Sequence, residues 1–364
     1  MQKILWSVVS IICLSNTTSF GQDSAERADP DQLQRLTERL ERQEDRLNEL
    51  LRHLSPDRTS NFLRGAVERT STETSHFRPL YTINRDGTDL KFLVAAPDMI
   101  TTGTPQWSHD GKMIVLDSTP VTDQVALSQI WVYGVTGAFR GMIRHLGVGN
   151  TPTWSPDDLQ IAYMVNPGNP DSVAPGVWVM NADGTNKRRI GQGWYTRWSP
   201  DGQEICVQNI ETNPNSLRLY NPETGTQREI LGGEIGVMFG GANWSADGQK
   251  LITLVQRDGE QQLITIDASG DTDSISVIYR ESTGDRTLVG PPVLSPDGSE
   301  ILFAIQDQSN PQQHTSRWSN TFIYLISADG SSEPRLLEGQ KIGRINRSYD
   351  WHPDGSKIIF SSER

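Results

Sequence analysis

Short apolar runs alternate with polar turns through most of the chain, and the arrangement recurs at a nearly regular spacing. The segment PQWSHDGKMIVLDS at 105–118 places a polar turn between an aromatic stretch and an apolar run. Similar segments begin at 152, 196, 242, 292 and 349. Asp and Gly at their centres suit a tight turn, because Asp bonds nearby backbone and Gly accepts a positive φ. Each copy therefore predicts a hairpin of two strands.

A second kind of hairpin follows the first within each repeat. It is clearest at 176–191, where GVWVMNADGTNKRRIG places a turn between two β-type runs. Counterparts centre on 134–137, 221–225, 267–270 and 327–330, and one more, at 80–94, precedes the first repeat. Two hairpins in about 45 residues give four strands, which is the size of one propeller blade.

The two ends of the repeat region are incomplete in complementary ways. The strands at 80–94 have no hairpin of the first kind before them, and the last such hairpin, which ends at 358–360, has no second hairpin after it. Pairing the two would complete a sixth blade and close the ring, which removes exposed sheet edges. The predicted fold class is therefore all-β, a six-bladed β-propeller over 76–364 closed by its N- and C-terminal strands.

A helical pattern precedes the repeats. Leucines at 33, 36, 40, 47, 50 and 54, with Gln43 between them, are spaced by three and four residues in turn. This spacing predicts an amphipathic helix over 31–54 with a coiled-coil seam, within a polar segment 22–54. We interpret it as an oligomerisation helix that could form a homo-oligomer. The alternative is a helix that packs on the propeller or spaces it from a membrane. Residues 55–75 are predicted to be a linker.

The first 21 residues have the features of a secretory signal peptide. Lys3 is followed by an apolar run over 4–14, and Ser19 and Gly21 place small residues before a cleavage site at Gln22. The apolar run is too short to span a bilayer, so no transmembrane anchor is expected. The predicted location is the periplasm or the extracellular medium.

The net charge and the cysteine content limit the kinds of partner and of covalent cross-link that the protein can have. The net charge of −12 and the pI near 5.0 argue against nucleic acid as a partner, because nucleic-acid binding needs a basic face. Cys13 lies in the segment expected to be removed. Cys206 is then alone in an apolar run, where we predict a small buried side chain and no disulfide.

No motif of a known catalytic or metal site occurs. HExxH, GxSxG, P-loop and GxGxxG patterns are missing from the sequence. The repeated Asp residues of the turns would lie around the ring, so we predict that they form turns, and that the repeated Trp residues pack between blades. His109 and His352 belong to blades that would be neighbours and could approach one another. We predict no catalytic residue, no metal and no cofactor.

Any binding function must then involve residues that do not repeat. Propellers bind ligands at the axial channel, where the inner strands begin. Aromatic and Arg residues at these segments are favoured at interfaces. The candidates for such a funnel site are Trp194, Tyr195, Arg197, Phe239, Arg286, Arg344, Arg347 and Tyr349. In an acidic protein this cationic group could receive an acidic peptide, an acidic glycan or another envelope protein.

The repeat resembles that of the TolB-type propeller family, a WD40-like repeat with the pattern WSPDGxxIAF, NADG and RRLT. The segments NADG at 181–184, RRI at 188–190 and WSPDG at 198–202 match it almost letter for letter. The resemblance implies a propeller that acts as a non-catalytic scaffold of the cell envelope. TolB itself carries an α/β domain before its propeller, where this chain has only a short helix. The alternatives are a TolB-like translocation component, and a lyase or hydrolase that acts on a polysaccharide or peptide in the funnel.

Overall fold

The computed structural model describes residues 78–121, 124–211, 215–232, 235–281, 284–309, 320–340 and 345–363. The expected signal peptide, the helix at 31–54 and the linker at 55–75 lie outside the described residues, so they stay predictions. Within the described ranges no helix is both long and apolar enough to cross a membrane.

The described residues form four antiparallel sheets of four strands each. The first contains β3 (Thr101–Trp107), β4 (Met113–Thr119), β5 (Gln129–Gly134) and β6 (Ile143–Val148), and the second contains β7 (Asn150–Trp154), β8 (Gln160–Val165), β9 (Gly176–Asn181) and β10 (Arg188–Gly191). The third contains β11 (Trp194–Trp198), β12 (Ile205–Asn209), β13 (Ser216–Tyr220) and β14 (Gln227–Leu231), and the fourth contains β15 (Gly236–Trp244), β16 (Lys250–Arg257), β17 (Glu260–Asp267) and β18 (Ser276–Glu281). Two hairpins build each sheet, as the two kinds of turn in the sequence predict.

A fifth sheet has eight strands, taken from both ends of the described chain. It contains β19 (Arg286–Leu294), β20 (Glu300–Asp307), β21 (Thr321–Ser327), β22 (Arg335–Leu336), β23 (Ile345–Trp351), β24 (Lys357–Glu363), β1 (Leu80–Asn84) and β2 (Lys91–Val94). Its two halves are joined by one parallel pair, Thr321 with Ile345. Strand β24 pairs with β1 in antiparallel register, from Leu80 opposite Ser361 to Asn84 opposite Lys357.

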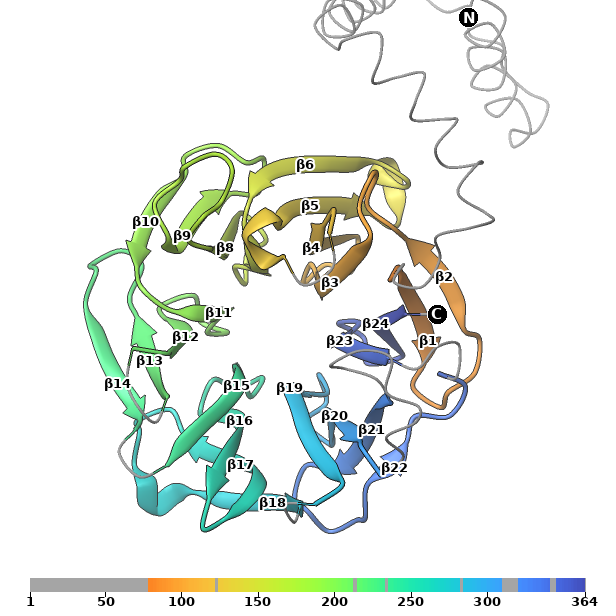
Figure 1. Ribbon diagram of the computed structural model, residues 1–364, viewed down its shortest axis with the longest axis vertical. Coiled ribbons are helices and arrows are strands. Elements are labelled where there is room, and N and C mark those ends of the chain that lie inside the picture. The colour runs from red at the N-terminus through yellow and green to blue at the C-terminus, as the bar shows by residue number, and fades with distance from the viewer. Residues whose placement is uncertain are drawn as a thin grey trace, which may run out of the picture. The chain divides into compact units, whose positions relative to one another are not determined.

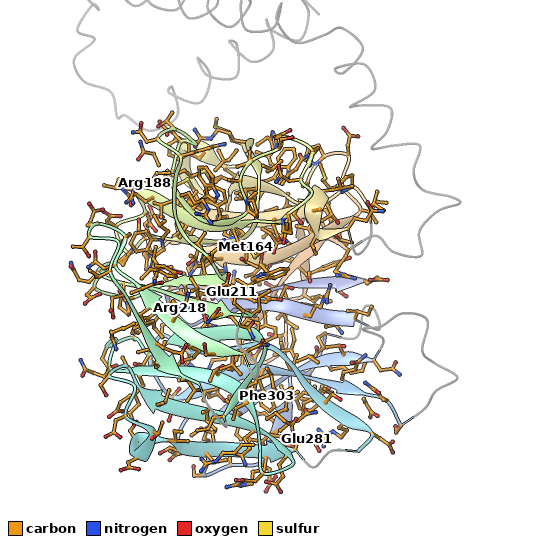
Figure 2. All side chains as sticks on the ribbon, turned by 60° about the vertical axis from the view of Figure 1, so that its left-hand side comes forward. Met164, Arg188, Glu211, Arg218, Glu281 and Phe303 are labelled. Atoms are coloured by element: carbon orange, nitrogen blue, oxygen red, sulfur yellow. The ribbon has the colours of Figure 1, made fainter. Side chains whose placement is uncertain are left out.

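The sheets stand around a common centre, with β3, β7, β11, β15, β19 and β23 innermost (Figure 1). This is the architecture of a β-propeller, and apart from three short 3₁₀ turns the described residues are all β or loop. Apolar side chains, among them Phe303 of β20, fill the space between neighbouring sheets (Figure 2). Trp154 of β7, for example, is 1 % exposed and packs with Val115 and Val132 of the preceding sheet. The predicted packing role of the repeated Trp is confirmed at Trp107, Trp154 and Trp351, which are buried.

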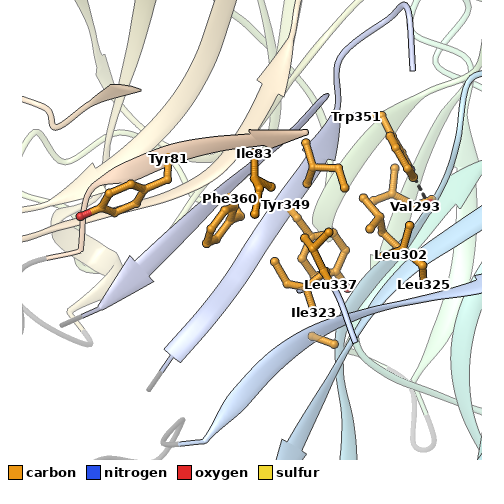
Figure 3. Packing of buried hydrophobic residues seen from close by; sticks show 12 residues of the cluster. Tyr81, Ile83, Val293, Leu302, Ile323, Leu325, Leu337, Tyr349, Trp351 and Phe360 are labelled. Atoms are coloured by element: carbon orange, nitrogen blue, oxygen red, sulfur yellow. Dashed lines mark hydrogen bonds between the residues drawn. The ribbon is translucent and has the colours of Figure 1, made fainter. Parts of the chain in front are cut away.

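The core also joins the first and last strands. Tyr81 and Ile83 of β1 pack in one cluster with Phe360 of β24 and Tyr349 of β23 (Figure 3). All four side chains are buried. Residues from opposite ends of the described chain therefore share one apolar core.

The repeated Asp residues stabilise the turns, as predicted. Asp201 accepts hydrogen bonds from Ser199 Oγ at 2.6 Å and from the backbone N–H of Gln203 at 2.9 Å. These bonds lower the pKa of Asp201, with the Ser199 hydroxyl contributing most. Gly202 completes the turn with a φ of 72°. Asp157, Asp247 and Asp297 make equivalent pairs of bonds.

Neighbouring turns also contact one another. In the second repeat Asp158 replaces the turn glycine, and its carboxylate accepts bonds from the backbone N–H and the Nδ1 of His109, both at 2.9 Å. The ring of His352 instead packs edge-on against Trp107, with centroids 4.6 Å apart. The two histidines thus have separate partners, and no described residues form a group of three or more potential metal ligands.

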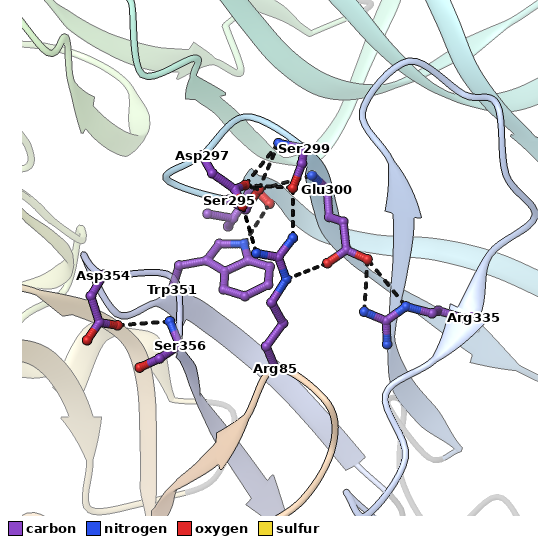
Figure 4. A network of polar contacts seen from close by, with 10 residues as sticks. Arg85, Ser295, Asp297, Ser299, Glu300, Arg335, Trp351, Asp354 and Ser356 are labelled. Carbon is purple, nitrogen blue, oxygen red and sulfur yellow. Dashed lines mark hydrogen bonds and ion pairs between the residues drawn. The ribbon is translucent and has the colours of Figure 1, made fainter.

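A polar network ties the end of β1 to the start of β20 (Figure 4). Arg85 donates to Glu300 at 2.7 Å, to Asp297 at 2.8 Å and to Ser299 at 2.7 Å. Its guanidinium also lies over the ring of Trp351, 5.4 Å from the centroid. Arg85 therefore holds the first strands against the neighbouring half of the eight-stranded sheet, and its hydrogen bond to Asp297 contributes most to raising the arginine pKa.

Candidate binding cavity at the centre of the propeller

Every innermost strand is interrupted by a shift in its pairing register. The interruptions contain residues with positive φ: Thr104 (34°), Thr151 (47°), Tyr195 (53°), Gly241 (71°), Gly290 (75°) and Ser348 (52°). In five strands this residue lies three positions before the repeated Trp. The repeat that contains β19 has Leu294 in place of the Trp, and Pro291 lies three positions before it. Proline cannot adopt a positive φ, so the preceding residue, Gly290, has the positive φ in this strand. Such bulges interrupt the ladder and redirect side chains, and they are common beside functional sites.

The bulges surround a cavity of about 690 Å³ at the centre of the ring. Its wall comes mainly from the beginnings of β3, β7, β11, β19 and β23 and from the end of β4. Thr104, Thr151, Tyr195, Gly290 and Ser348, all bulge residues, are part of the lining. Backbone conformations that are strained for Thr, Tyr and Ser are therefore concentrated at this one place, which is typical of binding sites.

Two buried carboxyl groups accept hydrogen bonds from inner strands of the next sheet. Asp117 of β4 is 5 % exposed, lines the cavity and accepts a hydrogen bond from the backbone N–H of Thr151 at 3.2 Å. Asp350 of β23 accepts from the backbone N–H of Trp107 at 3.1 Å. Burial raises the pKa of both, that of Asp350 to about 6, although neighbouring arginines oppose the shift. Each carboxylate links its own strand to the first strand of the next sheet.

Polar side chains next to the repeated Trp continue this pattern around the ring. Gln106 accepts from the backbone N–H of Trp154 at 2.6 Å. Arg197 Nε donates to Asn243 Oδ1 at 2.6 Å, and Asn243 Nδ2 donates to the carbonyl of Pro292 at 2.6 Å. The position before the Trp therefore joins successive inner strands, a role that the sequence analysis did not assign to it.

Of the eight residues predicted for the funnel, five line the cavity: Trp194, Tyr195, Arg197, Arg347 and Tyr349. Tyr349 is also part of the core, and burial raises the pKa of its hydroxyl. Arg286 is not brought to the cavity, because it pairs with Glu281 at 3.4 Å and lies over the ring of Tyr324. Arg344 and the side chain of Phe239 lie outside what the structure describes. The binding role of the five stays a prediction.

Several lining residues were not predicted, among them Arg78, Asp117, Thr151 and Ser348. A signal for Thr151 and Ser348 exists in the sequence, since both lie three residues before the repeated Trp. Asp117 lies near the end of the second strand of its hairpin, ten residues after the repeated Trp, where the other copies carry neutral residues such as Gln208 and Ser361. A charged residue at a repeat position that is otherwise neutral is the sequence signal for Asp117.

We expect the replacement of Asp350 by Asn to stabilise the protein near pH 7.5 but not near pH 4. Burial raises the carboxyl pKa from 3.8 to about 6, so the folded protein binds this proton more tightly than the unfolded chain. The contribution of Asp350 to stability therefore falls as pH rises through this window. Asn stays neutral and keeps an oxygen for the Trp107 N–H. Urea unfolding at both pH values should show a relative gain of roughly 2–3 kcal/mol near pH 7.5. A difference that does not vary with pH would contradict the assignment.

Comparison with known proteins finds sequence similarity to TolB proteins and to an uncharacterised relative. No family model matches the chain. An uncharacterised Agrobacterium fabrum protein is 21 % identical over 281 residues, which cover 70 % of this chain and 83 % of that protein. The Tol-Pal system protein TolB of Francisella tularensis subsp. mediasiatica is 24 % identical, over 69 % of this chain. The chain spans only 54 % of that relative.

Solved structures agree with the sequence comparison. An Agrobacterium tumefaciens protein assigned provisionally as TolB superposes with a TM-score of 0.59 at 18 % identity, over 79 % of this chain and 98 % of that one. TolB of Acinetobacter baumannii gives a TM-score of 0.50 at 14 % identity, over 84 % of this chain and 69 % of that one. At these identities the likeness concerns the fold alone. The chain therefore has a TolB-like β-propeller fold.

Proposed function

We propose that this protein is an exported, non-catalytic binding protein whose propeller receives a segment of another cell-envelope protein. The observation that carries the proposal is the central cavity, which joins aromatic and cationic side chains, Trp194, Tyr195, Arg197 and Arg347, to bulged inner strands. A few placed polar groups in a largely apolar hollow are typical of ligand sites. The TolB-like fold supports a place in the envelope, and a translocation role like that of the Tol-Pal system is a narrower form of the same proposal.

The number of blades, the closure of the ring, the export and the oligomerisation of the protein are also part of this proposal. The four separate sheets and the two halves of the eight-stranded sheet would make six blades, and the pairing of β1 with β24 would close the ring. Residues 1–21 would direct export to the periplasm or beyond, and the leucine seam over 31–54 would join copies of the chain. Light scattering of the secreted protein, with and without residues 22–75, measures its oligomeric state and tests whether the leucine seam joins copies of the chain.

The binding proposal is tested by capture of partners from envelope extract on the full-length protein. Replacing Arg197 or Arg347 with Ala should lower partner recovery about tenfold or more, the effect of a central contact at an interface. Arg286→Ala is the matched control, because this arginine lies outside the cavity lining and is already paired with Glu281. Circular dichroism establishes that each variant is folded. If both cavity variants recover the same partners at wild-type levels, the cavity is not the binding site.

The second candidate is an enzyme that acts on a polysaccharide or peptide. It is favoured by two buried carboxyl groups with raised pKa values, Asp117, which lines the cavity, and Asp350 of the inner strand β23. Both groups accept backbone N–H bonds that link inner strands, which explains their burial without catalysis. Cleavage of an acidic polysaccharide by the wild type, lost in Asp117→Asn, would replace the binding proposal with this one.

A further inference from the structure

Among the described residues, no carboxylate is in direct contact with the guanidinium of Arg197. It lines the cavity, and its hydrogen bonds run from Nε to Asn243 Oδ1 and from Nη1 to the carbonyl of Thr196, at 2.6 and 2.9 Å. No ion pair between described residues includes it. Arg78, which also lines the cavity, shows the contrast, because it is paired with Glu363. A desolvated cation without an anion in contact is costly, so an anionic group of a ligand would be stabilised at this point.

The nearby acids do not neutralise Arg197 by direct contact. Asp350 and Asp117 attract it from a distance, but each carboxylate accepts a backbone N–H of a neighbouring inner strand. Burial lowers the pKa of Arg197, although an arginine remains charged at every physiological pH. The positive charge is therefore desolvated, and the attraction of the two acids offsets only part of that cost.

The side chain is also held in a fixed position. Asn243, which accepts from Arg197 Nε, is itself fixed by its bond to the carbonyl of Pro292. The bulge at Tyr195, two residues earlier in β11, sets the direction of the strand at this point. Nε and Nη1 are thus occupied by protein, and Nη2 makes no hydrogen bond to a described residue. A guanidinium fixed in this way is ready to bind a carboxylate.

The rest of the wall favours a peptide over a glycan. Val125, Met238, Val289 and Pro291 present apolar side chains between the polar residues of the lining. The hydroxyl groups of a sugar polymer would be left without partners against these side chains, whereas apolar peptide side chains would be buried favourably. Interrupted strands can also offer backbone groups to an extended chain.

We propose that the cavity is specific for a peptide with an acidic residue, whose carboxylate is bound by Arg197 while the apolar side chains next to it in the peptide pack against Met238, Val289 and Pro291. This inference rests on the proposed binding function and adds the chemistry of the partner segment. Arg197 is then a specificity-determining residue, and the acidic side chain of the partner supplies the missing counter-charge.

Selection of a random peptide library on the full-length protein tests the inference. Peptides selected on the wild type should be enriched in Asp or Glu next to apolar residues. A selected peptide should bind Arg197→Met about 10–100-fold more weakly, as expected for loss of a charged hydrogen bond, and Arg286→Met as tightly as the wild type. The analogue of this peptide that has Gln in place of Glu should bind the wild type, Arg197→Met and Arg286→Met with similar affinity. Selected peptides without acidic enrichment would overturn the inference and leave the binding function standing. Failure to select any peptide, or binding of polygalacturonate instead, would overturn both.

A second measurement avoids any folding defect of the variant. Phenylglyoxal modifies exposed arginines, and mass spectrometry locates the modified residues in the wild-type protein. The selected acidic peptide should protect Arg197 from modification at least several-fold and leave Arg286 unprotected. Equal modification of Arg197 with and without saturating peptide would overturn the assignment of the carboxylate to this residue.

Discussion

Replacing Glu363 with Gln is expected to lower the free energy of unfolding by about 3–5 kcal/mol. Glu363 ends β24 and forms an ion pair with Arg78, which precedes β1, and the two side chains are only 7 % and 5 % exposed. The Nε of Arg78 lies 3.2 Å from the carboxylate, and its Nη2 also contacts the same oxygen. The Gln variant would leave the guanidinium buried without a counter-charge. Urea unfolding at neutral pH measures the loss.

The same substitution at an exposed pair provides the control. Glu260 contacts Arg280 at 3.0 Å, with side chains 42 % and 53 % exposed, so Glu260→Gln should change stability by less than about 1 kcal/mol. The double variant Arg78→Met with Glu363→Leu should recover most of the lost stability, because no buried charge remains. Equal, small effects at Glu363 and Glu260 would show that the pair of Arg78 and Glu363 is not desolvated.

The fold could be predicted because its signals are local and repeated. Each hairpin carries its own turn chemistry, seen in the bonds of Asp201 and in the φ of Gly202. The apolar runs beside each turn specify which faces are buried, as at Trp154. Even the pairing of β1 with β24 had a sequence signal, because the hairpins at the two chain ends were incomplete in complementary ways.

The cavity was only partly predictable, because it depends on contacts between repeats. The aromatic and cationic character of Trp194, Tyr195 and Arg197 was visible in the sequence, but Arg286 has the same character, and only the structure shows that it lies outside the cavity lining and pairs with Glu281. The bulges were missed for a similar reason. A positive φ at Thr151 is unfavourable for a β-branched residue and is imposed by the surrounding ring, so local preference alone does not predict it.

Replacing Phe360 with Ala is expected to cost about 3–5 kcal/mol of stability, the range for large aromatic side chains in a core. Phe360 of β24 is fully buried and lies opposite Tyr81 of β1 in the strand register, with ring centroids 6.1 Å apart. Ile83, Leu337 and Tyr349 belong to the same cluster. The cavity left by Ala cannot collapse easily, because Ile83 and Tyr349 come from strands fixed by their own ladders. Urea unfolding again provides the measurement.

Phe92 offers a matched control, because it contacts the same tyrosine from the solvent side. Its ring packs edge-on against Tyr81 at 6.0 Å, but its side chain is 61 % exposed. Phe92→Ala should therefore cost no more than about 1.5 kcal/mol, the value of an aromatic pair without much buried area. A large loss of stability at Phe360 with a small loss at Phe92 would mean that β1 and β24 are held together by their shared core. Similar losses at both positions would mean that Phe360 is accessible to water, and that β24 separates from β1 in solution.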